Sequence, residues 1–181
     1  MRKPKINIVT LGCSKNKVDS ERLAASLSHY YDIMHDSDKK SDVVIINTCG
    51  FIGDAKEESI DTILEYAELR KANKIKKLYV MGCLSQRYRK DLQNEIHEVD
   101  GFFGVESVSL IASQILRFSD SQVLKFSDSQ ILRFSDLKYN HERLLSTPSH
   151  YAYLKISEGC NRRCAFCAIP LIRGEHVSVP M

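Results

Sequence analysis

Three closely spaced cysteines near the C-terminal end are the residues most able to do chemistry. Cys160, Cys164 and Cys167 form a C-x-x-x-C-x-x-C motif within the stretch SEGCNRRCAFCAIPLIRG. Thiolates are the standard protein ligands of iron–sulfur clusters. Three thiolates on a 4Fe–4S cluster leave one iron open, and catalytic metal sites are distinguished from structural ones by such an open position. The motif therefore predicts a catalytic cluster. The less favoured alternatives are a chance spacing of cysteines and a structural zinc site, for which His176 is the nearest candidate as fourth ligand.

The other three cysteines are far apart in the sequence but share one kind of position. Cys13, Cys49 and Cys83 each follow an apolar, strand-like run, in INIVTLGC, VVIINTC and LYVMGC. The carboxyl ends of parallel strands lie at one edge of a sheet, where open α/β sheets bind ligands. These cysteines should therefore meet in space, either as a shared metal site or as buried core thiols. The first motif favours a second cluster. Asn16 and Asn47, in the same loops, either line that site or serve as turn and capping residues.

The elements that would position these cysteines alternate along the first part of the chain. Continuous apolar runs predict buried strands, and apolar residues spaced by three and four predict helices between them. Such alternation indicates an α/β fold with a parallel sheet and helices on both faces. The expected strands are 6–11, 32–35, 43–47, 78–81 and 101–105, and the expected helices are 19–29, 54–72, one starting near 85, and 108–116.

The second part of the chain is organised differently. Residues 114–137 repeat an eight-residue unit three times, as QILRFSDS, QVLKFSDS and QILRFSDL, and we interpret them as a duplicated insert without function. Residues 138–150 form a polar linker, and the alternating YAYLKI at 151–156 predicts a new strand. We therefore expect an N-terminal domain over 1–113, an insert and linker over 114–149, and the start of a second domain over 150–181.

Composition limits the class of protein. The chain has 181 residues, a formal net charge of +3 and 43% hydrophobic residues. Its apolar runs are far too short to cross a bilayer, and the basic N-terminus lacks the apolar region of a signal peptide. Six cysteines in this pattern do not resemble a disulfide framework. We expect a soluble, cytoplasmic protein without a membrane partner, whose mild charge permits a ribosome or RNA partner without arguing for one.

With these motifs in place, the sequence resembles the methylthiotransferase family of radical-SAM enzymes. The matching segments are LGCSKNKVDSE, DVVIINTCGFIGDAKEES, LYVMGCLSQRY and YLKISEGCNRRCAFCAIPLIRG. The resemblance implies two 4Fe–4S clusters. Cys160, Cys164 and Cys167 would hold the cluster that binds S-adenosylmethionine, with Phe166 near the adenine unless it only packs within the loop. Cys13, Cys49 and Cys83 would hold an auxiliary cluster.

Within the family, the segments LGC-x-KN-x-VDSE, NTCGFI and KISEGCN resemble the branch that modifies an aspartate of a small-subunit ribosomal protein. The alternative is the branch that modifies an adenosine in tRNA. The resemblance implies that a radical derived from S-adenosylmethionine abstracts hydrogen from the aspartate β-carbon, which then receives a methylthio group. It also implies an electron donor such as flavodoxin or ferredoxin.

The family's radical-SAM domain is a partial (β/α) barrel, in keeping with barrel sizes generally. Residues 150–181 would supply only its first strand and the cluster loop. Two hypotheses follow. Either the sequence represents the aspartate-modifying methylthiotransferase, or the 181-residue chain is an inactive cluster-binding fragment.

Overall fold

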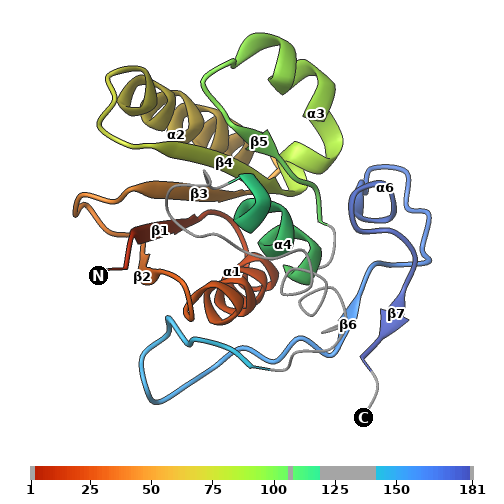
Figure 1. Ribbon diagram of the computed structural model, residues 1–181. Helices are drawn as coiled ribbons and strands as arrows, with labels where there is room; N and C mark the ends of the chain where they lie inside the picture. The colour runs from red at the N-terminus through yellow and green to blue at the C-terminus, as the bar shows by residue number, and fades with distance from the viewer. Residues whose placement is uncertain (1–2, 106–107, 119–141, 180–181) are drawn as a thin grey trace.

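The computed structural model describes residues 3–105, 108–118 and 142–179. It contains a five-stranded, all-parallel sheet in the order β2-β1-β3-β4-β5 and a separate antiparallel pair, β6-β7. The predicted α/β fold with a parallel sheet is thereby confirmed (Figure 1). The elements are β1 (Lys5–Thr10), α1 (Ser14–Leu27), β2 (Asp32–His35), β3 (Val43–Thr48), α2 (Gly53–Lys71), β4 (Lys77–Gly82), α3 (Cys83–Glu95), β5 (Gly101–Phe102), α4 (Val108–Phe118), β6 (Ser157–Glu158), α6 (Ile169–Arg173) and β7 (Val177–Ser178).

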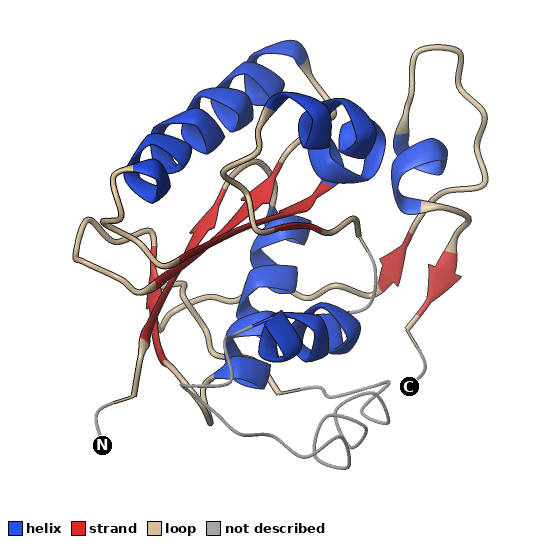
Figure 2. Ribbon diagram, turned by 45° about the horizontal axis from the view of Figure 1, so that its top comes forward, coloured by secondary structure: helices blue, strands red, loops and turns tan. Residues whose placement is uncertain are grey.

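Helices cover both faces of the sheet, as Figure 2 shows. On one face, α1 and α4 pack over alternate strand residues that include Ile8 and Ile45. On the other face, α2 and α3 pack over the intervening residues, which include Val44 and Ile46. Strand β3 is therefore buried on both sides, which explains its continuous apolar sequence.

Helix α4 crosses the predicted domain boundary at residue 113. It continues to Phe118, and Ile115 and Leu116 of the first repeat unit are 1% and 3% exposed in the core against α1. The start of the repeat is therefore part of the domain, because its apolar residues complete the inner face of this helix. The remaining repeat residues, 119–137, lie outside the described part of the chain.

The predicted strand at 151–156 is wrong. These residues have no strand partner within the described ranges, and the short strand β6 begins only at Ser157, pairing with β7. Leu154 and Ile156 are 82% and 69% exposed. An alternating sequence becomes a strand only where a neighbouring strand completes its hydrogen bonds, and here the segment lies against α1 instead.

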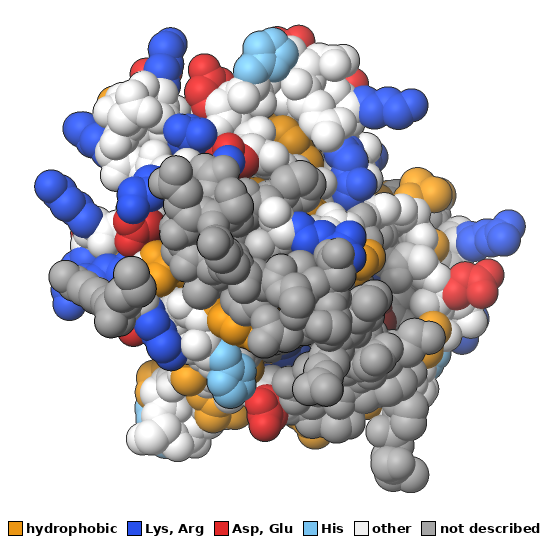
Figure 3. All heavy atoms as spheres, viewed as in Figure 1, with side chains coloured by type: hydrophobic (Ala, Val, Ile, Leu, Met, Phe, Trp, Pro, Cys, Tyr) orange, Lys and Arg blue, Asp and Glu red, His pale blue; other side chains and the backbone are white. Residues whose placement is uncertain are grey.

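One face of the molecule shows how its charged side chains are distributed. Lys and Arg side chains are spread around the visible face rather than gathered in one patch (Figure 3). None of the described helices is both long and apolar enough to span a membrane.

Candidate functional site

The three strand-end cysteines lie together at the carboxyl edge of the sheet. Cys13 precedes α1, Cys49 follows β3, and Cys83 begins α3. A Cβ atom built on Gly12 would lie 2.6 Å from the Cβ atom of Cys49 and 3.0 Å from its Sγ atom. The loops that carry Cys13 and Cys49 therefore touch. Cys13 is exposed, whereas Cys49 and Cys83 are 8% and 7% exposed.

Glycine is required where these loops approach one another. Gly12 has a φ of +87° and Gly82 a φ of +100°, both in the region that side chains rarely adopt. A Cβ atom on Gly82 would lie 2.6 Å from the carbonyl oxygen of Thr48. The glycines therefore let the chain turn directly into two of the cysteines.

Two buried asparagines tie the cysteine loops together. Asn16, fully buried, donates from Nδ2 to the carbonyl oxygens of Leu11 (2.8 Å) and Thr48 (3.1 Å). Asn47 donates from Nδ2 to the carbonyl oxygen of Asn16 (2.9 Å) and to Ser20 Oγ (3.0 Å). Asn47 therefore braces the loops. Asn16 both braces them and faces the site, because its Oδ1 atom lies 3.9 Å from Cys83 Sγ.

Arg173 reaches the same edge from the far end of the chain. Its Nη2 donates to Asn16 Oδ1 (2.7 Å), and its Nη1 donates to Asp19 Oδ2 (3.1 Å) and Glu158 Oε2 (2.9 Å). The guanidinium also interacts with the Cys83 thiol. No local pattern in the sequence indicates a role for Arg173, because its contacts to Asn16 and Asp19 span more than 150 residues. The position is visible only after folding.

The pKa of the Cys83 thiol lies above its ordinary value. Burial raises the pKa of Cys83, the nearby Arg173 guanidinium lowers it, and the neighbouring Cys49 and Cys13 raise it again. Mutual repulsion therefore opposes ionising the three thiols together. A metal cluster would remove that penalty, because metals bind cysteine as the thiolate. The donor set thus fits a thiolate-bound cluster.

The second cysteine set lies on one loop before α6. The Cys160 amide donates to the carbonyl oxygen of Gly174 (3.0 Å), and the Cys167 amide donates to that of Cys164 (3.1 Å). Cys164 is exposed, and Cys160 and Cys167 are partly exposed. Phe166 is 93% exposed and therefore does not pack within the loop. Its predicted place near an adenine stays a prediction.

Neither set is arranged around a single ion. Among the described residues, no three His, Cys, Asp or Glu side chains are grouped so that they could hold one metal ion. The thiolates of a cluster each bind a different iron, so they need not converge on one point. Both ligand sets remain predictions on this geometry.

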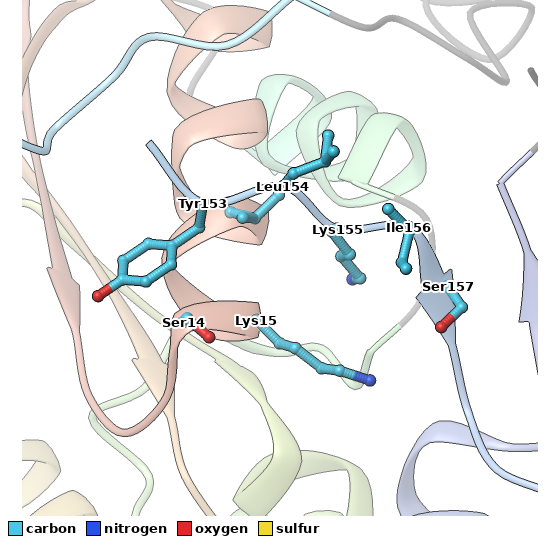
Figure 4. A pocket seen from close by; sticks show the side chains of 8 residues that line it. Ser14, Lys15, Tyr153, Leu154, Lys155, Ile156 and Ser157 are labelled. Carbon is cyan, nitrogen blue, oxygen red and sulfur yellow. The ribbon is translucent and has the colours of Figure 1, made fainter. Parts of the chain in front are cut away.

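One pocket lies beside the cysteine edge without including a cysteine. It has a volume of about 170 Å³, and Tyr153 to Ser157 run there alongside Ser14 and Lys15 at the start of α1 (Figure 4). The same contact carries two ion pairs, from Lys155 Nζ to Asp19 Oδ1 (2.6 Å) and from Lys155 to Glu158. The pair with Asp19 docks the segment that precedes the cluster loop onto α1, whereas the pair with Glu158 joins two residues of that same segment.

Comparison with known proteins agrees with the resemblance seen in the sequence. The family described as "Uncharacterized protein family UPF0004" matches residues 5–104, which hold the sheet and the first three cysteines. "Ribosomal protein uS12 methylthiotransferase RimO" of Phocaeicola vulgatus is 50% identical over 183 residues, covering 100% of this chain. The proteins of the same name from Cytophaga hutchinsonii and Porphyromonas gingivalis are 50% and 48% identical, over 99% and 100% of this chain.

The chain spans only part of these relatives. It covers 39% of the Phocaeicola protein and 38% of the other two. The matched family nevertheless accounts for the whole described parallel sheet. This chain belongs to the UPF0004 family and is similar, over its full length, to ribosomal protein uS12 methylthiotransferases.

Proposed function

We propose that this chain provides the two cluster-binding sites of a radical-SAM methylthiotransferase whose substrate is an aspartate of ribosomal protein uS12. The relatives' name supplies the reaction class and the substrate protein. The observation that carries the proposal is the convergence of Cys13, Cys49 and Cys83, from three separate strand ends, at one sheet edge. Structural core cysteines need no such shared position.

The two cysteine sets have different surroundings, which suit different tasks. The strand-end set is backed by buried asparagines and by rigid strands, so its position is fixed by the sheet. The Cys160, Cys164 and Cys167 set lies on a partly exposed loop. A site fixed by the sheet, with two of its three cysteines buried, suits the auxiliary cluster, and a loop with no buried cysteine suits the cluster at which S-adenosylmethionine must bind.

When bound, one cluster would pass on the electron that cleaves S-adenosylmethionine, the auxiliary cluster would carry the sulfur, and S-adenosylmethionine would supply the methyl group. The chain's own residues would hold and orient these groups. Cys13, Cys49 and Cys83 would ligate one cluster, and Cys160, Cys164 and Cys167 the other, with an external donor such as flavodoxin or ferredoxin supplying the electron. Arg173 places a buried positive charge beside the first set, where thiolates gather negative charge.

Iron counting after anaerobic reconstitution with iron and sulfide tests the proposal. The Cys13→Ala, Cys49→Ala, Cys83→Ala triple variant should keep about half of the iron bound by the unchanged chain, because each set holds one cluster. The matched Cys160→Ala, Cys164→Ala, Cys167→Ala triple variant should also keep about half, and a variant lacking all six cysteines should keep none.

One control and two possible outcomes make the result decisive. Circular dichroism before reconstitution checks that each variant retains its helices. If the strand-end triple variant keeps all the iron, Cys13, Cys49 and Cys83 are not cluster ligands and the auxiliary site is refuted. If iron is lost completely from either triple variant, the two sets form one site rather than two.

A further inference from the structure

We propose that Arg173 is a positioning residue that fixes the Cys160–Cys167 loop against the strand-end cysteines. The proposal rests on the proposed function in treating these cysteines as two ligand sets. The geometric observation does not depend on the proposed function: Arg173 and its neighbour Gly174 hydrogen-bond both to the Cys160–Cys167 loop and to Asn16 beside the strand-end cysteines. Arg173 is also the most enclosed cation at the junction, with its side chain only 6% exposed.

The side chain of Arg173 holds the strand-end set. Its guanidinium bonds Asn16 Oδ1, and Asn16 in turn bonds the carbonyl oxygens of Leu11 and Thr48. Leu11 lies two residues before Cys13, and Thr48 directly precedes Cys49. Through a single amide, the guanidinium is therefore connected to the two loops that carry these cysteines.

The backbone beside Arg173 holds the other set. The Gly174 carbonyl oxygen, next in sequence, accepts the hydrogen bond of the Cys160 amide at 3.0 Å. The Arg173 guanidinium also bonds Glu158, two residues before Cys160, at 2.9 Å. Helix α6, which ends at Arg173, packs against α3, which begins at Cys83. Any movement of Arg173 therefore shifts Cys160 relative to the sheet edge.

The charges around Arg173 are arranged to keep it there. Three cations, Lys15, Lys155 and Arg173, surround two carboxylates, Asp19 and Glu158. This cluster therefore carries one excess positive charge beside Cys83. It attracts the C-terminal segment to α1 and favours negative charge on the adjacent thiols.

The planar guanidinium is suited to this position in a way that an ammonium is not. Its Nη1 atom donates to the carboxylates of Asp19 and Glu158, while Nη2 donates to Asn16 Oδ1. Lysine would keep the charge but has a single nitrogen on a flexible stem. The Arg173→Lys variant should therefore keep the loop docked and lose the connection to Asn16.

Hydrogen exchange on the full-length, reduced, metal-free chain tests this geometry. In Arg173→Gln, exchange should become about tenfold or more faster in residues 157–178 and in the loops at 11–16 and 48–50, because a buried charge pair is broken. In Arg173→Lys, protection of 157–178 should largely return while that of the loops should not.

The control is Arg143→Gln, which removes another arginine ion pair of the same C-terminal segment. Arg143 bonds Glu21, away from the cysteines, at 3.2 Å from its Nε atom. Its loss should speed exchange in 142–153 and leave the cysteine loops within about twofold of the unchanged chain. If Arg143→Gln disturbs those loops equally, or Arg173→Gln leaves them unchanged, the positioning role is refuted. Should Arg173→Gln not fold, Arg173→Lys carries the same test.

A spectroscopic measurement on the reconstituted chain adds a readout that general loosening would not move. Magnetic interaction between two reduced clusters broadens their electron paramagnetic resonance lines. This broadening should be weakened in Arg173→Gln at unchanged iron content. Unchanged broadening would refute the positioning role. Failure of the unmodified chain to bind iron would refute the proposed function, while the exchange experiment would still decide the role of Arg173.

Discussion

Replacing Gly82 by alanine should destabilise the domain strongly, because this glycine lies at the turn from β4 into Cys83. Its backbone has φ +100° and ψ −161°, a region that is essentially accessible to glycine alone. An added Cβ atom would lie 2.5 Å from Asn47 Oδ1, 2.6 Å from the Thr48 carbonyl oxygen and 2.9 Å from the Thr48 amide nitrogen. Two of these neighbours are backbone atoms of β3, the central strand, and cannot turn away.

The expected loss of unfolding free energy combines two costs. Holding alanine in that backbone region costs about 1–3 kcal/mol. Displacing the packed β3 backbone adds roughly 1–3 kcal/mol, as overpacking of a core does. The sum, about 2–6 kcal/mol, is a large part of the roughly 5–15 kcal/mol by which a domain is stable.

Urea unfolding of the reduced chain, followed by circular dichroism, measures this loss. The denaturation midpoint should fall by about 1–3 M, given a slope of roughly 2 kcal/mol per M. Gly53→Ala is the matched control, since Gly53 also lies at the N-terminal end of a helix but a Cβ atom there would meet nothing within 4 Å. If Gly82→Ala unfolds within about 1 kcal/mol of the unchanged chain, the reasoning from backbone strain is refuted.

Three further predictions concern the packing that supports the site. Burial raises the pKa of the Glu21 carboxyl, but hydrogen bonds from Ser146 and Arg143 lower it more, so its net pKa lies below the usual value. The stability that ionised Glu21 contributes is therefore complete above its pKa in the unfolded chain, and it is lost as the pH falls through its lower pKa in the folded chain. Hydrogen exchange of residues 142–146, compared at pH 6 and pH 3, should show this loss in the unchanged chain but not in Glu21→Gln. Ile115→Ala should cost about 2–4 kcal/mol in urea unfolding, because α4 packs Ile115 into the core, and a loss below 1 kcal/mol would contradict that packing. Asp100→Asn should cost roughly 2–3 kcal/mol in the same assay, since it weakens ion pairs to Arg70 (3.0 Å) and Lys77 (2.9 Å), and no loss would show that these pairs contribute nothing.

Much of the fold follows from local pattern. Strand β3 was predicted within one residue, because a strand buried on both faces needs an unbroken apolar run. The predicted helix at 19–29 begins five residues earlier, at Ser14, because its first turn is polar and lacks the apolar spacing that indicates a helix. The strand expected at 101–105 is shortened to Gly101–Phe102, since only these residues pair with β4.

The segments that were misjudged depend on partners elsewhere in the chain. The alternating residues 151–156 have the composition of a strand, but an ion pair from Lys155 to Asp19 of α1 holds the segment, and no neighbouring strand in the described part of the chain completes it. Residues 114–118 looked like the start of an insert, yet their apolar side chains complete the contact between α4 and α1. In both cases the local sequence is compatible with either outcome.

For the candidate site, residue types and spacing were sufficient to predict that three cysteines distant in sequence lie near one another, while their role as cluster ligands stays a prediction. The strand periodicity places Cys13, Cys49 and Cys83 after parallel strands, and parallel strands share their carboxyl edge. No local pattern could indicate Arg173, because its contacts to Asn16 and Asp19 span more than 150 residues. Local sequence specifies the elements and the chemistry of their ends, whereas the charge beside Cys83 arises only when packing brings distant side chains out of water and against each other.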